Sequence, residues 1–309
     1  MFPWSYKKNG IIGINARNLD FIFPENKRKL YPLVDDKLKT KRLAESAGIP
    51  TPELYGVIEF QNQAKQLEQL VAPHRSFVVK PSKGSGGGGI IVVDDIVESG
   101  FKKASGEIMS RGDMRYHLNN ILSGMYAMGG QSDRVLLEYV VQFDPIFNDI
   151  TFRGVPDLRI ILYRGIPLMA MLRLPTRASD GKANLHKGGI GVGISMRDGI
   201  TLHGVSGGKF MDNHPETSRS ISGRQIPNWR KILEMASKLY DITGLGWLGA
   251  DIVLDRTKGP MLLEANARPG LAIQVANREG LGTRFDKLKQ FSGDWQNVEQ
   301  RVEFSLTHF

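Results

Sequence analysis

The sequence predicts an α+β protein built from β-hairpins and amphipathic helices. Three pairs of strand-like runs, each joined by a turn or loop, indicate antiparallel sheet: residues 77–80 with 90–93, 158–163 with 168–172, and 249–255 with 261–266. Helical periodicity separates them. A chain of 309 residues is long enough for two domains, or for one large domain with subdomains.

The composition is that of a soluble globular protein, with 41% apolar and 24% charged residues. No apolar run approaches the ~20 residues that span a bilayer, and the first ten residues lack the apolar region of a secretory signal. The chain has no cysteine, which excludes disulfides, thiolate metal sites and cysteine nucleophiles. These features fit a reducing compartment, and we expect a cytoplasmic protein without membrane contacts.

The net charge of +9 points to an anionic partner. The basic residues are dispersed, apart from short clusters at residues 27–29 and 37–42, and no nucleic-acid-binding motif accompanies them. We therefore favour anionic small molecules or acidic peptides over nucleic acid as the reason for the charge.

Four segments have helical periodicity: residues 36–47, 61–71, 113–126 and 228–241. Gly48 and Pro50 should end the first helix. Asp113 and Asn228 precede or open later helices and are expected to cap them. Residues 1–36 show little periodicity, and the tail after residue 277 is expected to be helix and surface.

Further strand signals complete the order of elements. Residues 135–141 form a β-rich run, and residues 164–167 have the composition of a hairpin turn. Residues 175–209 are rich in Gly, Lys, Arg and Asn, which predicts a long loop with strands inside it.

The stretch KPSKGSGGGGIIVV, residues 80–93, resembles several phosphate-binding loops. A Walker A loop has its lysine after the last glycine, but Lys80 and Lys83 come before the glycines. Gly84, Gly86 and Gly89 fit G-x-G-x-x-G, yet a strand-forming run follows where a dinucleotide fingerprint needs a helix.

The glycines therefore belong to the tip of a β-hairpin. Backbone N–H groups in such a flap can donate to phosphate oxygens, and Lys80 on the incoming strand can reach a phosphate. The alternative is a hairpin loop that holds no ligand.

Two strands near the end of the chain carry oxygen donors. Asp251 lies in GADIV, and Glu264 and Asn266 lie in LLEAN. Residues two apart on a strand share a face, so Glu264 and Asn266 point the same way, and Asp251 lies beside them if the strands pair. Hard oxygen donors of this kind suit Mg²⁺ shared with substrate phosphates. Ordinary polar residues on two surface strands are the alternative.

The ordered set of segments resembles the ATP-grasp superfamily, and within it the α-L-glutamate ligases. The matching stretches are DKLKTKRLAESAGIPTP, VVKPSKGSGGGG, LLEYV, DLRIILYRGIPL, KANLHKGG, GADIV and LLEANARPG, over roughly residues 35 to 275. The segment HPETSRSISGRQIPNW also resembles ATP-grasp proteins linked to sugar-transfer clusters. The resemblance implies two α+β subdomains with antiparallel sheets that grip ATP between them.

The resemblance also implies boundaries for these subdomains. Residues 37–134 would form the N-terminal subdomain with the glycine flap, and residues 135–276 the C-terminal subdomain with the Mg²⁺ site. Residues 277–309 would be a tail. Family ligases usually carry a substantial domain before the DKL helix, whereas only a short segment, residues 1–36, precedes it here. We expect the acceptor site to come from residues 175–220 or from a partner chain.

Roles for individual residues follow from the same resemblance. Residues near the nucleotide would be Lys37, Lys80, Gly84, Ser85, Gly86, Gly87, Gly88, Glu138, Tyr139, Val140, Asp157 and Asn184. Glu138 and the backbone of Tyr139 and Val140 would recognise adenine. The metal ligands would be Asp251, Glu264 and Asn266, binding two Mg²⁺ ions, with Mn²⁺ as an alternative.

The arginines would serve the reaction itself. Arg268 would lie next to the reaction centre, and Arg159 and Arg173 would grip the carboxylate or acyl phosphate. The alternative for each is an ordinary ion-pair or surface residue. His186, in NLHKGG, would position substrate or be merely exposed.

The implied reaction is ATP-dependent amide formation through an acyl phosphate, joining a carboxylate to the amine of an amino acid or peptide, with glutamate as one candidate. Two further readings stay open. One is a phosphotransferase that forms no amide, and the other is a nucleotide-binding scaffold without turnover.

Overall fold

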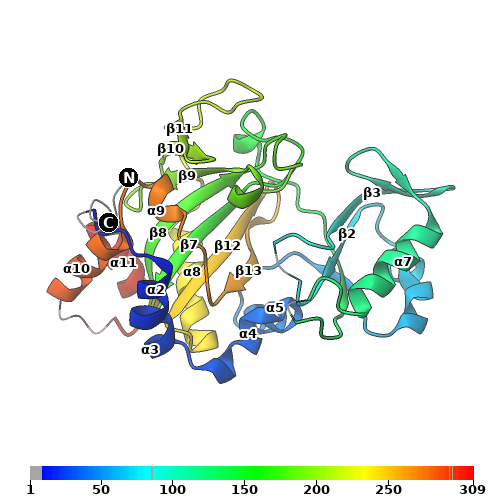
Figure 1. The fold of residues 1–309 in the computed structure, drawn as a ribbon, viewed down its shortest axis with the longest axis horizontal. Helices are drawn as coiled ribbons and strands as arrows, with labels where there is room; N and C mark the ends of the chain where they lie inside the picture. The colour runs from blue at the N-terminus through cyan, green and yellow to red at the C-terminus, as the bar shows by residue number, and fades with distance from the viewer. Residues whose placement is uncertain (1–8, 85, 128, 292, 294) are drawn as a thin grey trace. The chain divides into compact units, whose positions relative to one another are not determined.

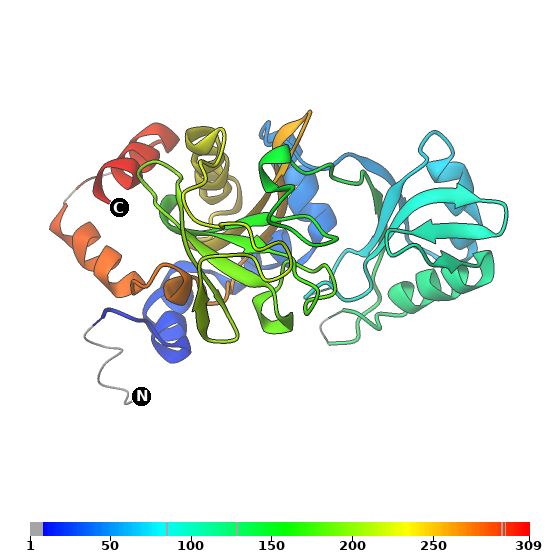
Figure 2. The ribbon, with the colours of Figure 1, turned by 90° about the horizontal axis from the view of Figure 1, so that it is seen from above.

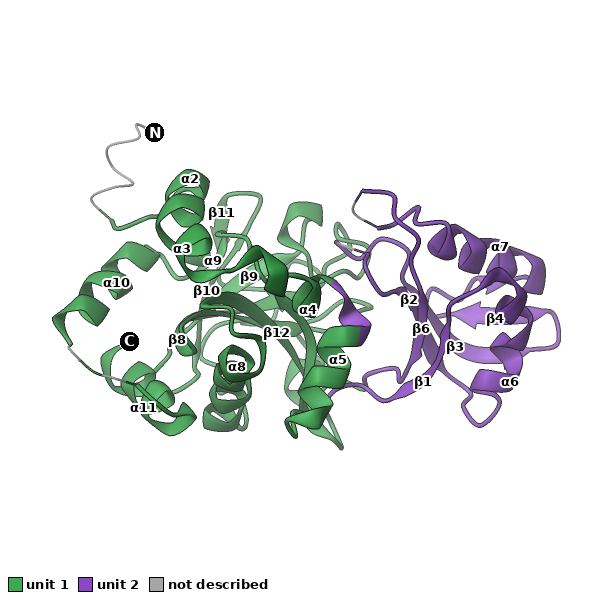
Figure 3. Ribbon diagram, turned by 90° about the horizontal axis from the view of Figure 1, so that it is seen from below, with its two compact units in different colours: residues 1–35, 39–50, 142–309 green, residues 36–38, 51–141 purple. Residues whose placement is uncertain are grey.

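The computed structural model describes residues 9–84, 86–127, 129–291, 293 and 295–309. The chain divides into two compact units, coloured separately in Figure 3. Unit 1 comprises residues 1–35, 39–50 and 142–309, and unit 2 comprises residues 36–38 and 51–141. Residues 135–141 belong to unit 2, whereas the sequence places them at the beginning of the C-terminal subdomain. The reason is that strand β6 (Val135–Glu138) pairs with two strands of unit 2.

Unit 2 is built on an antiparallel sheet with the strand order β1-β6-β2-β3-β4-β5. Its other strands are β1 (Leu54–Ile58), β2 (Phe77–Pro81), β3 (Ile91–Val97), β4 (Gly100–Lys103) and β5 (Ile108–Met109). Its helices are a 3₁₀ helix (Gln61–Gln66), α6 (Leu67–Val71) and α7 (Arg111–Leu122), the last seen beside the strands in blue-green in Figure 2.

The core of unit 2 lies between this sheet and its helices. Alternate strand residues, including Phe77, Val79 and Leu137, pack against Met114 and Leu118 of α7. The predicted helix at 113–126 begins earlier, because the Ser110 hydroxyl accepts a hydrogen bond from the Asp113 N–H at 3.1 Å. Ser110, not Asp113, is therefore the N-cap.

Unit 1 is built on a seven-stranded antiparallel sheet with the order β11-β10-β9-β8-β7-β12-β13 (Figure 1). The strands are β7 (Asp157–Tyr163), β8 (Ile166–Leu174), β9 (Ile190–Ile194), β10 (Thr201–Ser206), β11 (Lys209–Met211), β12 (Trp247–Asp255) and β13 (Gly259–Asn266). The hairpins expected at residues 158–172 and 249–266 are both present as β7–β8 and β12–β13.

Helices flank the sheet of unit 1. The longer ones are α5 (Lys37–Ser46), whose first two residues count with unit 2, α8 (Trp229–Thr243), α10 (Leu281–Gln290) and α11 (Val298–His308). The short ones are α2 (Ile14–Ala16), a π-helix (Arg17–Ile22), α3 (Phe23–Glu25), a 3₁₀ helix (Arg28–Leu30), α4 (Pro32–Asp35), 3₁₀ helices at Pro145–Phe147 and Leu185–Lys187, and α9 (Ile273–Ala276). Within the described residues no helix combines the length and apolar character needed to cross a membrane.

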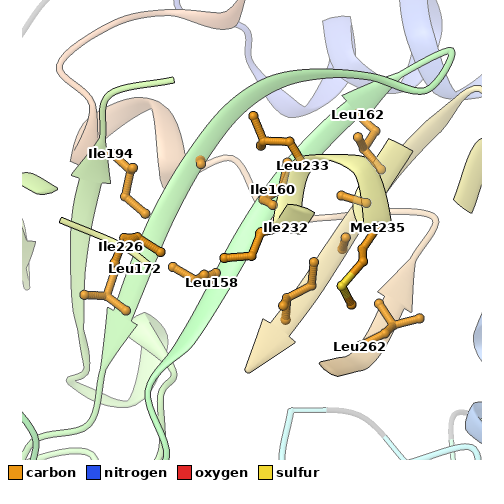
Figure 4. Close-up of a cluster of buried hydrophobic side chains, with 14 of the residues drawn as sticks. Leu158, Ile160, Leu162, Leu172, Ile194, Ile226, Ile232, Leu233, Met235 and Leu262 are labelled. Carbon is orange, nitrogen blue, oxygen red and sulfur yellow. The ribbon is translucent and has the colours of Figure 1, made fainter. Parts of the chain in front are cut away.

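The sheet of unit 1 has an apolar core on each face. On one face, Ile232, Leu233 and Met235 of α8 form one cluster with strand residues that include Ile160 and Leu262, as Figure 4 shows. Asn228 stands at the N-cap of α8 but makes no capping bond with its side chain, because its backbone is left-handed (φ 58°). Asn228 is therefore at the expected N-cap position, but its side chain does not cap the helix.

The second face carries the strand residues that alternate with those of the first face. Ile161, Met169 and Trp247 pack there against Ile22 of the N-terminal segment and Phe285 of α10. The segment before residue 36 and the tail are thus part of the core of unit 1. The sequence shows little periodicity in the first segment, whose helical turns are too brief to give a periodic signal, and predicts helix and surface for the tail, which forms α10 and α11.

The β7–β8 turn depends on Gly165, which lies against the buried side chain of Arg301. Arg164 and Gly165 both have positive φ (47° and 78°), as a two-residue hairpin turn requires. A Cβ on Gly165 would lie 2.2 Å from Nη1 of Arg301. Arg301 is 1% exposed and its guanidinium bonds Asp241, so it has little freedom to move away.

We expect Gly165→Ala to destabilise the protein by about 3 kcal/mol, of which about 1 kcal/mol is the cost of positive φ and the rest the clash with Arg301. Gly259→Ala is the matched control, since Gly259 also has positive φ (74°) and no atom of the described residues lies within 4 Å of a Cβ placed on it. Urea unfolding of both variants measures the difference. Equal losses in the two variants would contradict the packing argument.

Candidate functional site

The glycine loop of unit 2 joins β2 to β3, as predicted. These strands pair antiparallel, with Phe77 opposite Val93 and Val79 opposite Ile91. Gly86 and Gly87 at the tip have positive φ (61° and 73°), and no described atom lies within 4 Å of a Cβ placed on Gly86. Ser85, predicted to contact the nucleotide, lies outside the described residues. Among the described residues, no side chain therefore fills the space beside Gly86 at the tip.

The start of the loop is fixed to α5. The Lys37 backbone N–H donates to Ser82 O at 2.9 Å, and its Nζ donates to Gly84 O. Buried Asp36 accepts from the Ser82 hydroxyl at 2.6 Å and forms an ion pair with Arg134. The predicted residue Lys37 thus lies at the base of the glycine loop.

The end of the loop is held by two residues that the sequence reasoning missed. His117 Nε2 on α7 lies 2.9 Å from Gly89 O, and since a carbonyl only accepts, the imidazole donates. Burial lowers the pKa of His117, although the bond to Gly89 opposes that shift. A Cβ on Gly89 would lie 2.7 Å from the ring of Tyr126. No motif links these residues to the loop, and only the packing of α7 reveals them.

Lys80 and Glu138 form a buried ion pair on neighbouring strands of unit 2. Lys80 Nζ lies 2.6 Å from Glu138 Oε2, and the two side chains are 6% and 2% exposed. Next along the chain, the Tyr139 N–H donates to Glu53 O at 2.9 Å. Of the predicted adenine-recognition residues, Glu138 is the last residue of β6, which pairs with the Lys80 strand, and Tyr139 and Val140 follow it directly.

We expect Lys80→Met to destabilise the protein by about 3 kcal/mol, because it leaves a carboxylate buried without its cation. Lys83→Met should cost little, since Lys83 is a more exposed lysine whose Nζ donates to a neutral carbonyl, Ser132 O at 3.0 Å. Adding Glu138→Gln to Lys80→Met should restore part of the loss. Urea unfolding of the three variants tests this, and a Lys80→Met protein as stable as Lys83→Met would refute it.

In unit 1, the predicted metal ligands come together on β12 and β13. Asp251 lies directly opposite Glu264 in the ladder, and Gly249 lies opposite Asn266. Directly opposed residues have Cβ atoms about 5 Å apart on one face of the sheet. Asn266 Oδ1 also accepts from the Arg268 N–H at 2.8 Å. The hairpin expected from the sequence thus places all three oxygen donors on one side.

A network of two arginines and two aspartates surrounds this position. Arg159 donates to Asp251 through Nε at 2.8 Å and Nη2 at 2.6 Å. Arg173 pairs with Asp157 through Nε, and through Nη2 at 2.8 Å. The same Nη2 lies 2.8 Å from Asp251 Oδ2. Arg159 and Arg173 are therefore engaged by acids of their own chain, and Asp157 is held by an arginine.

Burial and charge act differently on the two aspartates. Burial raises the pKa of Asp157 to about 6, and the nearby Asp251 charge adds to this against the opposing effect of Arg173. Burial also opposes ionisation of Asp251, but Arg159 and Arg173 outweigh it and hold the pKa of Asp251 at about 2. The same acids raise the pKa of Arg173, although burial opposes the shift. Asp251 is therefore the fixed anion of the network.

Two other predicted residues of unit 1 have local structural partners. Asn184 Oδ1 accepts from the His186 N–H at 2.9 Å and so caps the 3₁₀ helix at Leu185–Lys187. Arg268 lies over the ring of Tyr31, 5.1 Å from its centroid, with a guanidinium nitrogen 3.5 Å from Asp35. Their predicted roles at the nucleotide and the reaction centre stay predictions.

Among the described residues no three His, Asp or Glu side chains cluster as a metal site. The predicted donors are two carboxylates and one amide, which is a different set. Oxygen donors on one sheet face are the type that a hard cation takes, while Asp251 is also paired with Arg159 and Arg173. Their role as metal ligands stays a prediction.

The pH dependence of stability tests the Asp157 environment. A carboxyl with a higher pKa when folded stabilises the protein fully below pH 4 and loses that contribution as the pH rises to about 6. We expect Asp157→Asn to remove about 2 kcal/mol of this change between pH 4 and 6. Asp286→Asn, at an exposed site on α10, is the control for the loss of one carboxylate. Urea unfolding across this pH range is the measurement, and identical profiles for Asp157→Asn and the native protein would contradict it.

A glycine hairpin on one antiparallel sheet, with paired acids and an Asn on a second, is the set of features on which the resemblance to ATP-grasp proteins rests. The chain belongs to the sugar-transfer associated ATP-grasp family, whose model matches residues 16–290. The resemblance stated from the sequence is confirmed at this level. A search of curated proteins finds no match.

Solved structures of ATP-grasp ligases are similar at low identity. The ligase PsnB, complexed with a minimal precursor, is 12% identical with a TM-score of 0.46, covering 86% of this chain and 63% of its own. D-cycloserine synthetase DcsG is 12% identical with a TM-score of 0.47, covering 93% and 81%. D-alanine–D-alanine ligase from Bacillus anthracis is 13% identical with a TM-score of 0.45, covering 98% and 76%. The match to PsnB thus spans less than two thirds of that protein.

Proposed function

We propose that the protein is an ATP-dependent carboxylate–amine ligase. In the first step an oxygen of a substrate carboxylate attacks the γ-phosphorus of ATP, the bond to the β-phosphate oxygen breaks, and an acyl phosphate and ADP form. In the second step an amine attacks the acyl carbon, phosphate leaves, and the amine loses a proton to give the amide. This reaction depends on positioning and charge neutralisation more than on a protein nucleophile, which suits a chain without cysteine.

The glycine loop supplies the phosphate contacts in this proposal. Its tip has positive φ at Gly86 and Gly87, a geometry in which backbone N–H groups can converge on an anion. Lys37 bonds the loop at Gly84 and brings a positive charge to it. Family membership and the ordered hairpin support ATP as the nucleotide.

The observation that carries the proposal is the register of β12 and β13. It sets Asp251 against Glu264 with Asn266 on the same face, and these three residues would hold Mg²⁺, or Mn²⁺ as an alternative. A bound ion there would neutralise phosphate charge as a Lewis acid. Binding and scaffold functions need no such donors, so their presence favours turnover.

The substrates are an acid and an amine of the amino-acid or peptide class, with glutamate as one candidate. Arg159 and Arg173 would bind the carboxylate or the acyl phosphate, because a guanidinium pairs with carboxylate and phosphate oxygens through two parallel bonds. Arg268 would lie next to the reaction centre. A partner chain, or residues 175–220, would complete the acceptor site.

Hydroxylamine trapping tests this function. Incubating the protein with ATP, Mg²⁺, hydroxylamine and a panel of amino acids and peptides should yield a hydroxamate and ADP for the correct acid. ADP without hydroxamate would instead support a phosphotransferase. An absence of ADP with every acid, despite ATP binding, would support a scaffold.

We expect Glu264→Gln to reduce hydroxamate formation by at least about a hundredfold, because it removes one of two anionic donors, in a protein that still folds. Glu107→Gln, at an exposed site between β4 and β5, is the control and should keep native activity. Native activity in Glu264→Gln would sink the metal assignment.

A further inference from the structure

The arginine network and the proposed cation compete for the same carboxylate. A carboxylate has about four lone-pair positions, and Asp251 already accepts three guanidinium bonds: two from Arg159 and one from Arg173. A divalent cation at Asp251 would stand within a few ångströms of both guanidinium groups. Like charges at that distance repel strongly in a site that is largely buried.

The two arginines are tethered unequally. Arg173 has two bonds to Asp157 besides its contact with Asp251. Arg159 forms its hydrogen-bonded ion pair with Asp251, and Asp157 acts on it only through charge, as the weakest of several influences on that carboxyl. Loss of the Asp251 bonds would leave Arg173 in place and Arg159 without its anion.

We propose that a divalent cation at Asp251 releases Arg159 to bind an anion of the substrate, while Asp157 keeps Arg173 fixed. The inference rests on the proposed function for the identity of that anion, a carboxylate or acyl phosphate. It assigns Arg159 as the mobile anion-binding group and Asp157 as the positioning residue for Arg173. Cation and acid then bind with positive coupling, which by linkage is reciprocal.

The net charge of the arginine–aspartate network supports binding of the cation before the substrate anion. Arg159 and Arg173 with Asp157 and Asp251 carry no net charge when all are ionised. The neutral group does not attract an incoming carboxylate. A divalent cation adds two positive charges to it, and a carboxylate then neutralises one of them.

Chemical modification of arginine measures the release directly. The full chain is treated with phenylglyoxal alone, with ADP, and with ADP plus MnCl₂, and each arginine is followed by peptide mass spectrometry. Binding of Mn²⁺ is recorded in parallel from the electron paramagnetic resonance signal of the free ion. Arg224 is the reference, because it forms a bidentate pair with Asp149 at 2.8 Å and its side chain is 20% exposed against 13% for Arg159.

With Mn²⁺ and ADP bound, we expect the modification rate of Arg159 to rise about fivefold or more. The rates at Arg173 and Arg224 should change little, and ADP alone should change none of them. In Asp157→Asn, Mn²⁺ should accelerate modification of Arg173 as well. The native comparison needs no variant, so a misfolded Asp157→Asn protein would not remove the test.

Three results would overturn the inference: no Mn²⁺ binding, bound Mn²⁺ with an unchanged Arg159, or equal acceleration at Arg159 and Arg173 in the native protein. The ligase proposal fails separately. If Mn²⁺ exposes Arg159 but no acid gives a hydroxamate, the ligase reading is wrong and the release stands. If hydroxamate forms while Arg159 stays unreactive, only the release is wrong.

Discussion

Burial of β12 on both faces is the constraint on which unit 1 depends. All nine residues of Trp247–Asp255 are buried, so every second side chain must find a partner on one face and the rest on the other. Leu248, Ala250 and Ile252 join the core beneath α8. Trp247 joins the opposite core, and further along that face Asp251 cannot be solvated. Its two arginines follow from this, because a buried carboxylate without cations would cost several kcal/mol. The charged residues of the site thus follow from a folding requirement. One face of β12 carries both apolar side chains and Asp251, and all of them are buried.

The sequence carried enough information for the hairpins and most longer helices, because each leaves a local pattern. The glycine run between two strand-forming stretches fixed the β2–β3 hairpin, and the spacing of Glu264 and Asn266 fixed their common face. The pairing of Asp251 with Glu264 also followed once a hairpin was assumed. Patterns of this kind depend on neighbours in sequence and can therefore be recognised in one sequence.

What the sequence did not reveal depends on distant contacts. Nothing near Arg159 or Arg173 indicates that both donate to Asp251, 92 residues from Arg159. No sequence pattern indicates that His117 and Tyr126 contact the end of the glycine loop. None indicates the role of the first 36 residues either, because tertiary packing holds their helical turns. The cap at Asp113 was misplaced because Ser110 offers the better geometry, a difference of three residues that propensity alone does not resolve.

The way unit 1 is divided along the chain has a consequence for its synthesis. Asn26 bonds both backbone groups of Trp247, with its Nδ2 2.8 Å from Trp247 O and its Oδ1 2.9 Å from Trp247 N, and Ile12 bonds Gln274 across 262 residues. Residues 51–141 can reach their own fold while the ribosome is still translating, since their partners are nearly all within that stretch. The N-terminal segment must instead wait, with Ile22 and Phe21 uncovered, until β12 and α10 emerge. Pairings at such separation are slow to close, and the apolar side chains of this segment therefore stay uncovered until late in synthesis.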